Sequence, residues 1–438
     1  MGNSFIDPLL GTIEIPPWLT TINDEPAIHR MMRIKQLGLK EFISFPSATH
    51  TRYMHSLGTM FLAGKLTDLL VKKEENREKG RKRTRLADNL KNNKNVLMAA
   101  GFFHDIGHGP FSHVLDFVIE KEFGRSHEEI ATDIVKHFAK ELEGDSIPVG
   151  VVNNIITKVN EPYPYLRGII NGPLDVDKVD YLLRDSYNVG LKYSFDSSQF
   201  FDQIAVLGDG DDLEKCQLGL EKTPQAVVCA ELFLLVWKSM YTLVYLIQKS
   251  RIAEKMLEKA ILFAIDNGYG IKDDIENIDR YMELDEAKLL SRIRESDGFP
   301  KEIYKRIFDT SKLYIPVLEE DLDSFKPGQK FSEDLLKSQD AVSEKMTKEL
   351  SKLESGRPYS IICDLVSSKN PKEIYIDEKD ENEEPIEVKD KSYVIRALTQ
   401  PQVLVKTYVH PEVPKIEKYT QELGKGIKAE IQRIMDGW

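Results

Sequence analysis

A short stretch, Gly101–His113, gathers three of the chain's nine histidines and one aspartate directly after an apolar run. Its sequence is GFFHDIGHGPFSH, and the adjacent His104 and Asp105 stand where glycine and proline break a predicted helix. An imidazole and a carboxylate at a helix end can both reach one ion lying beyond that end. This pair suits zinc, iron, manganese or nickel better than calcium. The dipeptide alone is weak evidence, because a buried or capping role also explains it.

Two further segments supply matching ligand types. His55 lies one turn into an apolar helix predicted for RYMHSLGTMFLAGKLTDLLVKK. In PLDVDKVDYLLRDS, helical geometry puts Asp177, Asp180, Tyr181 and Arg184 on one face. A solvent-exposed face with salt bridges is the alternative explanation of that pattern. The metal ligands that we predict are His55, His104, Asp105 and Asp177.

Several blocks in order resemble the HD-domain phosphohydrolases, and among them the deoxynucleoside triphosphate triphosphohydrolases of animals, bacteria and archaea. The blocks are DPLLGTIEI, IKQLGLKEFISFPSATHTRYMHSLG, AAGFFHDIGHGPFSH, RSHEEIA and DVDKVDYLLRDSYNVG, with a weaker match at VYLIQKSRIAEKML. Their agreement is far more specific than a His-Asp pair. The resemblance implies a mainly α fold built on a helical HD-domain body. It also implies attack at the α-phosphate, which releases a deoxynucleoside and inorganic triphosphate.

The resemblance also implies roles for single residues. One divalent transition metal (Mn, Fe, Zn or Ni) is expected on the four predicted ligands, with Mg²⁺ as a further candidate beside the substrate phosphates. His127 is expected to protonate the leaving oxygen, with Glu128 orienting its ring. His108 and His113 are expected to assist, either by supporting the metal loop with Asp105 or by contacting phosphate. Positions matching phosphate contacts are Arg52, Lys178 and Tyr181. Positions matching sugar contacts are Gln36, Leu37, Asp185 and Tyr245.

Some positions depart from the family pattern. Leu246 replaces a glutamine of the animal enzyme, and one extra residue follows Gln36 before FPSATH, which leaves the base preference open. Asp24 matches a guanine-reading aspartate of the activator site, although a helix N-cap before a proline explains it equally. Met32 replaces an arginine of that site, and Gln248 a phosphate-binding lysine further on. We therefore expect weak or altered nucleotide activation, in a homo-oligomer that is a dimer or a tetramer.

Composition limits the classes of partner. The chain has 438 residues, 41% of them hydrophobic, with a net charge of −12 and a pI of about 5.4. An acidic chain is a poor general binder of polyanions, so a phosphate ligand needs a local cationic pocket. Nucleic acid is disfavoured as the main partner, and the basic stretch REKGRKRTRLADNLKNNK keeps it open. The three cysteines lack CxxC spacing, which is typical of a reducing cytoplasm. The sequence suggests no apolar run of membrane-spanning length, so we predict a cytoplasmic protein without a membrane contact.

The elements that position the site follow from patterning. DPLLGTIEIPPWL predicts an N-terminal hairpin, and helical periodicity then runs to about Ser311. Residues 72–94 are poor in apolar side chains and predict an exposed charged connection, with a basic contact surface as the alternative. YSIICDLV, EIYIDE, SYVIRAL and QVLVKTYVH predict strands, and PKIEKYTQELGKGIKAEIQRIM a closing helix. We predict a catalytic helical body over 1–310 and a smaller α+β lobe over 311–438.

Other functions remain compatible with these residues. One is an HD phosphohydrolase acting on other nucleotides, phosphate monoesters or single-stranded nucleic acid ends. Another is a nucleotide-sensing regulator that kept the fold. A regulator that only binds nucleotide could lose the catalytic acid, His127, and keep its binding pocket. This chain has His127 and Lys178 together with all four predicted metal ligands, which favours an enzyme.

Overall fold

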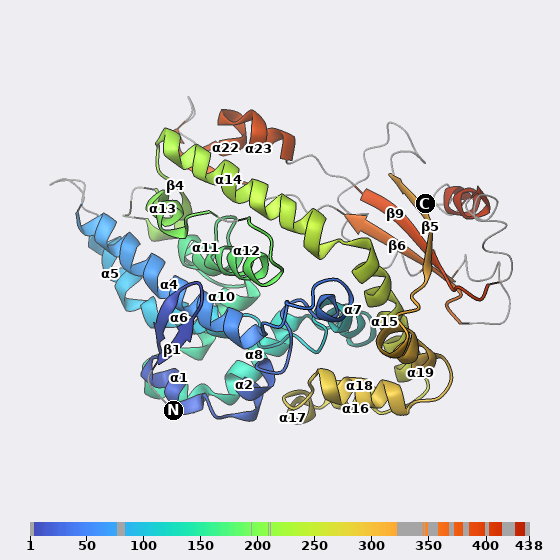
Figure 1. The fold of residues 1–438 in the computed structure, drawn as a ribbon. Helices are drawn as coiled ribbons and strands as arrows, with labels where there is room; N and C mark the ends of the chain where they lie inside the picture. Colours follow the sequence, from blue (N-terminus) through green and yellow to red (C-terminus); the bar gives the residue numbers. More distant parts are fainter. Residues whose placement is uncertain are drawn as a thin grey trace.

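The computed structural model is mainly helical, with three small sheets (Figure 1). It describes residues 4–76, 84–193, 195–208, 210, 212–321, 345, 347–348, 358–367, 372–379, 385–398, 403–413 and 425–433. The earlier helices are α1 (Pro17–Ile22), α2 (Pro26–Met31), α3 (Lys40–Ile43), α4 (Arg52–Glu75), α5 (Thr84–Asn92), α6 (Lys94–Phe103), α7 (His113–Phe123), α8 (His127–His137), α9 (Ala139–Gly144), α10 (Val149–Thr157), α11 (Pro164–Asn171), α12 (Val176–Asn188) and α13 (Ser197–Asp202). The later ones are α14 (Pro224–Met240), α15 (Gln248–Asp266), α16 (Ile271–Glu276), α17 (Ile278–Tyr281), α18 (Glu286–Glu295), α19 (Phe299–Tyr304), α22 (Val388–Lys391) and α23 (Tyr393–Leu398), with the 3-10 helix η1 (Leu213–Lys215) and the π-helices η2 (Tyr241–Tyr245) and η3 (Lys305–Asp309).

Helix α4 forms the centre of the helical body and packs against α5, α6 and α12. Glycines allow the closest crossings. A Cβ at Gly101 of α6 would lie 3.1 Å from the carbonyl oxygen of Thr59 on α4. A Cβ at Gly58 would lie 1.9 Å from the Asp180 carboxylate of α12. The helices that carry the predicted ligands therefore cross closely at glycines, and at Gly58 a Cβ would collide with the Asp180 side chain.

The sheets combine distant parts of the chain. The predicted hairpin is present as β1 (Ser4–Asp7) and β2 (Gly11–Glu14). A four-stranded sheet has the order β3-β4-β7-β8, and a three-stranded sheet the order β5-β9-β6. Their strands are β3 (Ile204–Leu207), β4 (Gln217–Leu220), β7 (Tyr375–Lys379), β8 (Pro385–Glu387), β5 (Ile315–Asp321), β9 (Val403–Val409) and β6 (Ile361–Ser367). Because β7 pairs with β4, part of the C-terminal segment completes a sheet of the predicted helical body. The predicted domain boundary at 310 stays a prediction.

Two predictions of local structure were wrong. SYVIRAL forms α23, because the Ser392 hydroxyl accepts a hydrogen bond from the Ile395 N–H and Ile395 is buried where α23 packs on α14. The predicted charged connection contains α5, whose Leu86, Ala87 and Leu90 are buried beside α4. Residues 77–83 of that connection lie outside the described residues. The closing helix is present over 425–433.

Helix α14 continues into η2, and together they form one long apolar helical segment. Helix α23 packs against α14 (Figure 1). Among the described residues, this 22-residue segment, Pro224–Tyr245, is the one helix long and apolar enough to cross a membrane. It is longer than the apolar run that the sequence suggested. Four of its large side chains are exposed: Val228, Leu232, Leu235 and Leu243. One such helix is weak evidence for a membrane, because core helices of soluble proteins have the same length and composition.

Candidate metal centre and active site

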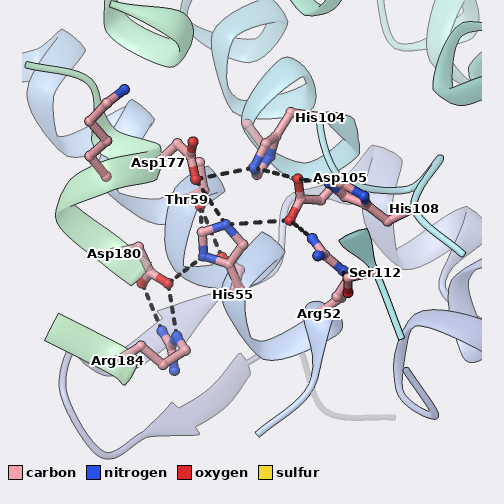
Figure 2. A network of polar contacts seen from close by, with 12 residues as sticks. Arg52, His55, Thr59, His104, Asp105, His108, Ser112, Asp177, Asp180 and Arg184 are labelled. Carbon is pink, nitrogen blue, oxygen red and sulfur yellow. Dashed lines mark hydrogen bonds and ion pairs between the residues drawn. The ribbon is translucent and has the colours of Figure 1, made fainter. Parts of the chain in front are cut away.

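The four predicted metal ligands come together between α4, α6 and α12 (Figure 2). His55 lies in the first turn of α4, His104 and Asp105 follow the last residue of α6, and Asp177 lies in the first turn of α12. The His55 Nε2 atom is 3.0 Å from Asp177 Oδ1 and 3.6 Å from Asp105 Oδ2. The His104 Nε2 atom is 3.2 Å from Asp105 Oδ1 and 3.4 Å from Asp177 Oδ1. We call these four residues the metal group.

The donor atoms of this group fit a transition metal. The Nδ1–H of His104 donates to the carbonyl oxygen of Gly101 at 2.8 Å, which directs Nε2 into the group. That Nε2 atom is buried and has no hydrogen-bond partner among the described residues. A buried polar atom without a partner is costly, and a bound cation would satisfy it. The imidazoles of His55 and His104 and the Asp177 carboxylate can therefore hold a divalent metal, whose identity the group does not fix. The Asp105 carboxylate lies beside these three ligands and is paired with Arg52.

The charges of the group also favour a cation. Burial lowers the pKa of His55, but the Asp177 and Asp180 carboxylates outweigh it and raise this pKa to about 10. The same opposition of burial and nearby carboxylates leaves the pKa of His104 raised. Burial opposes ionisation of Asp177, yet the imidazoles of His104 and His55 beside its carboxylate hold its pKa well below the usual range. A metal that displaces the two imidazole protons would meet this demand for positive charge.

A chain of buried charges fixes the His55 ring. Its Nδ1–H donates to Asp180 Oδ2 at 2.8 Å, so Nε2 faces the metal group. Arg184 donates two hydrogen bonds to Asp180, from Nε and Nη2, both at 2.8 Å. Its Nη1 donates to Asp7 of the N-terminal hairpin at 2.7 Å. The solvent-exposed reading of the α12 polar face was wrong, because Asp180 and Arg184 are buried.

Arg52 is anchored inside the site by a strained turn. Its Nη1 donates to the Asp105 carboxylate, and its Nε donates to the Ser112 hydroxyl at 3.0 Å. Phe111 and Ser112 both have positive φ, 59° and 49°, which L residues rarely adopt. Strain of this kind persists at sites where the surrounding structure enforces it. The turn thus holds a cationic side chain next to the metal group.

A second set of ligand-type side chains, His108, Asp116 and His127, lies beside the metal group, and we call it the histidine group. The rings of His108 and His127 stack at 3.8 Å between centroids. His108 Nδ1–H donates to Asp116 Oδ2 at 2.7 Å, and its Nε2 is 3.3 Å from Asp105 Oδ1. Burial and the positive charge of Arg52 lower the pKa of His108, but Asp116 and Asp105 leave it raised. Burial and then the charge of His108 lower the pKa of His127 to about 3.

Of the two stacked rings, His108 is therefore the one that its surroundings favour in the protonated form. Glu128 lies 3.4 Å from His127 Nδ1, as expected for an orienting carboxylate. His113 is 81% exposed and its Nδ1 is 3.6 Å from Asp116, so it lies at the rim of the histidine group. The role of His127 as the acid stays a prediction. Ser126 caps α8 through a capping box with Glu129, so a rigid helix start carries His127.

A buried arginine holds the turn that carries the HD pair. Arg30 is fully buried and donates from Nη1 to the Ile106 carbonyl oxygen at 3.0 Å and from Nη2 to that of His108. Tyr281 lies under its guanidinium, 4.6 Å from ring centroid to Cζ, and donates its hydroxyl to the Gly107 carbonyl oxygen. Three successive carbonyls of the turn are thus fixed by α2 and α17. A Cβ at Gly107 would also lie 1.9 Å from the His127 carbonyl oxygen.

The predicted sugar contacts gather at the other end of α12. Asp185 is buried, and its Oδ2 accepts a hydrogen bond from the Tyr245 hydroxyl at 2.7 Å. Tyr181 lies between, 6.5 Å from His55 and 6.1 Å from Tyr245 between ring centroids. The partly buried Gln36 and the buried Leu37 belong to the loop before α3.

The Lys178 ammonium is bound outside the metal group. It donates to Asp175 Oδ2 at 2.6 Å and to the Gly172 carbonyl oxygen at 3.0 Å. The N-cap reading of Asp24 was wrong. Helix α2 has Glu25 as its N-cap residue, without a side-chain hydrogen bond, and the Asp24 side chain is 80% exposed.

Sequence reasoning missed several residues that support the site. They are Asp7, Arg30, His50, Ser112, Asp116 and Tyr281, together with the supporting role of Asp180 and Arg184. Asp116 carried a usable signal, because it lies one helical turn after His113, just beyond the motif block that ends at His113. Arg30 and Tyr281 carried none, since a single arginine and a single tyrosine 251 positions apart have no local pattern.

Comparisons with known proteins agree with this geometry. Residues 52–185 match the model of the HD domain, and residues 217–407 match that of the HD associated region. An uncharacterized protein of Methanocaldococcus jannaschii is 29% identical over 300 residues, which cover 67% of this chain and 57% of that protein. The deoxynucleoside triphosphate triphosphohydrolase SAMHD1 homolog of Dictyostelium discoideum is 28% identical over 301 residues, covering 66% of this chain and 54% of its own length. The chain thus spans little more than half of these relatives.

One solved structure matches nearly the whole chain. A hypothetical protein from Aquifex aeolicus superposes with a TM-score of 0.70, covering 98% of this chain and 100% of its own, at 22% identity. At that identity the likeness concerns the fold. It places the helical body and the C-terminal sheets in one shared architecture.

Proposed function

This chain belongs to the HD-domain phosphohydrolase family and resembles its deoxynucleoside triphosphate triphosphohydrolases, and from that premise we propose that it hydrolyses deoxynucleoside triphosphates with a divalent metal. The products would be a deoxynucleoside and inorganic triphosphate. The observation that carries the proposal is the order of side chains along α12. Asp177, Tyr181 and Asp185 follow one another at intervals of four residues, so they line one face over about 12 Å of helix. A nucleotide lying along this face would put phosphate at the metal group and sugar at Asp185.

The phosphate end has cationic side chains in an acidic protein. A nucleoside triphosphate carries several negative charges near neutral pH, which an acidic chain must offset locally. Arg52 offers a planar fork and Lys178 a compact charge, each now paired with a carboxylate, Asp105 or Asp175. In our proposal both exchange part of these contacts for phosphate oxygens, and Tyr181 donates its hydroxyl.

The reaction needs an activated water and a proton for the leaving 5′-oxygen. A divalent metal held by the metal group would polarise the α-phosphate and lower the pKa of a water. The histidine group supplies the proton in this proposal, with the His127 ring stacked on that of His108. Asp116 raises the pKa of His108, and Glu128 keeps the His127 ring aligned.

Selectivity for a deoxyribose is proposed to arise at Tyr245. Its ring would cover the sugar beside Gln36 and Leu37 and leave no room for a 2′-hydroxyl. We also propose a cytoplasmic homo-oligomer, a dimer or tetramer, whose activation by guanine nucleotides is weak because Met32 and Gln248 lack the charges for phosphate. Losing a charged hydrogen-bond partner typically costs ~1.5–3 kcal/mol.

Product analysis tests the proposal. The pure protein is incubated with each dNTP and each NTP, singly and in pairs, with Mn²⁺, Mg²⁺, Fe²⁺ or Zn²⁺, and the products are separated. We expect deoxynucleoside and inorganic triphosphate from dNTPs, and little product from NTPs. Release of single phosphate or pyrophosphate would contradict the reaction, and equal rates for GTP and dGTP would contradict the role of Tyr245. Strong activation by micromolar GTP would contradict the expected weakness of the activator site.

A further inference from the structure

The Asp185 carboxylate is held from two sides by segments far apart in the sequence. His50 Nε2 lies 2.7 Å from Asp185 Oδ1, and the Tyr245 hydroxyl donates to Oδ2 at 2.7 Å. His50 belongs to the loop before α4, Asp185 to the last turn of α12, and Tyr245 to the end of η2. The His50 side chain is fully buried and that of Asp185 is 3% exposed. We call these three residues the hydroxyl end of the site.

With a neutral His50 ring, the polar atoms of this end that lack a partner are hydrogen-bond acceptors. Among the described residues, Asp185 makes no ion pair with a lysine or an arginine, and His50 is the basic side chain that contacts it. His50 Nδ1 and Gln36 Oε1 are both buried without a hydrogen-bond partner among those residues. The two lie in neighbouring segments, because the Gln36 N–H donates to the His50 carbonyl oxygen at 3.0 Å. Acceptors without a cation suit a ligand hydroxyl, and they disfavour phosphate.

The contact from His50 can orient the Asp185 carboxylate. The terminal torsion of an aspartate is broad, so a carboxylate held by one partner can turn. A carboxylate only accepts, so His50 must carry its hydrogen on Nε2 and leaves Nδ1 free to accept in the neutral ring. Tyr245 lies on a π-helix, a form that is frequent at functional sites. If a ligand hydroxyl takes the place of the Tyr245 hydroxyl on Oδ2, the contact from His50 is the one that still holds the Asp185 carboxylate.

We propose that His50 is a positioning residue that fixes the Asp185 carboxylate so that its Oδ2 side receives the 3′-hydroxyl of the substrate sugar. This inference rests on the proposed function. His50 touches the carboxylate and not the reacting phosphate, so its effect appears as discrimination between sugars. In this proposal the ligand hydroxyl donates to Asp185 Oδ2, either beside the Tyr245 hydroxyl or in its place.

The test compares two nucleotides that differ in one hydroxyl. Values of kcat and KM for dGTP and for 2′,3′-dideoxyGTP are measured with the wild type, His50→Leu and His50→Gln, with the exposed His137→Leu as the matched control. We expect His50→Leu to lower kcat/KM for dGTP about ten- to a hundred-fold, as for loss of a charge-assisted contact, and to change it little for the dideoxy nucleotide. His50→Gln, whose amide nitrogen can reach the position of Nε2, should restore much of the ratio.

The dideoxy nucleotide separates positioning from damage to the fold. An unchanged dGTP-to-dideoxyGTP ratio in His50→Leu overturns the inference, and so does an equal loss on both nucleotides. If the wild type hydrolyses neither, the proposed function fails. The same comparison made on the Kd of the two nucleotides then decides the inference: a ratio that collapses in His50→Leu and returns in His50→Gln supports it, and an unchanged ratio overturns it.

Discussion

The metal group and the hydroxyl end lie on the same helix but differ in how firmly the fold holds them. Three of the four metal ligands have a further contact outside the group: Gly101 for His104, Asp180 for His55 and Arg52 for Asp105. Asp180 is in turn held by Arg184, and the HD turn by Arg30 and Tyr281. The hydroxyl end has three hydrogen-bonding groups from three segments, and its His50 Nδ1 is buried without a partner among the described residues, as is Oε1 of the nearby Gln36.

The difference in the number of supporting contacts indicates which end of the site can change its ligand specificity. A metal site loses function when one ligand moves, so many contacts fix it. A hydroxyl end with few contacts can adapt to a different ligand with few substitutions. The metal group lies within the match to the HD domain, whereas Tyr245 comes from the associated region and His50 precedes the HD match. The following experiments, from the largest expected effect to the smallest, would break or sharpen this comparison.

Removing the HD pair should abolish function. The double variant His104→Ala/Asp105→Ala takes away half of the metal group, so bound metal and turnover should both fall to background. Metal content is measured by elemental analysis beside the single-turnover rate. The variant His137→Ala, which removes an exposed histidine of α8, should retain both. Full metal content in the double variant would remove these two residues from the metal site.

The histidine group should affect chemistry and spare the metal. We expect His127→Ala to keep metal and substrate binding and to lose ~10²–10⁴-fold in turnover, the usual contribution of general acid catalysis. His55→Ala should instead lose metal and turnover together. Metal content and single-turnover rate are measured on both variants. A His127→Ala variant within a few-fold of wild type would return this residue to a structural role and leave proton transfer to His108, His113 or water.

The layer behind the metal ligands should tune affinity. Asp180→Asn leaves the His55 ring without its carboxylate partner, and second-layer changes of this kind typically weaken metal binding ~10–100-fold. Competition against a chelator gives the Kd for Mn²⁺ or Zn²⁺. Asp279→Asn, at an exposed carboxylate of α17, is the matched control. Wild-type affinity in folded Asp180→Asn would mean that the helix crossing alone orients His55.

A buried carboxyl next to the Gln36 loop should make the stability of the protein depend on pH. Glu286 of α18 accepts a hydrogen bond from the Lys35 N–H at 3.0 Å, next to Gln36, and burial raises the pKa of its carboxyl from 4.5 to about 7. The folded protein therefore takes up a proton between these values, and stability falls as the pH rises through the window. The loss amounts to at most about 3 kcal/mol.

Glu286→Gln should remove this pH dependence. Compared with wild type, the variant should gain stability at pH 8 relative to pH 4.5, because its amide can still accept from Lys35 and never ionises. Denaturant unfolding at both values measures the change, with the exposed Glu283→Gln as the control. An equal stability difference at the two pH values would show that the buried carboxyl titrates normally.

The sequence by itself determined the HD turn and most of the helical body, and its resemblance to the HD family predicted which residues meet in the metal group. His104 and Asp105 are adjacent, and Asp177 and Asp185 lie on one helical face, so local spacing fixes their relation. Periodicity likewise predicted α4, α12 and the N-terminal hairpin. It failed at SYVIRAL, where a serine cap and packing on α14 outweighed β propensity.

Only the tertiary structure decided which distant side chains support the site. Arg30 and Tyr281 meet at the HD turn, and His50 meets Asp185, across separations for which no local pattern exists. It also decided that Asp180 and Arg184 are buried partners, since a helical face has the same spacing whether it meets solvent or another helix. The physical reason is that spacing fixes which residues share a face, whereas burial and long-range hydrogen bonds depend on what the fold packs against that face.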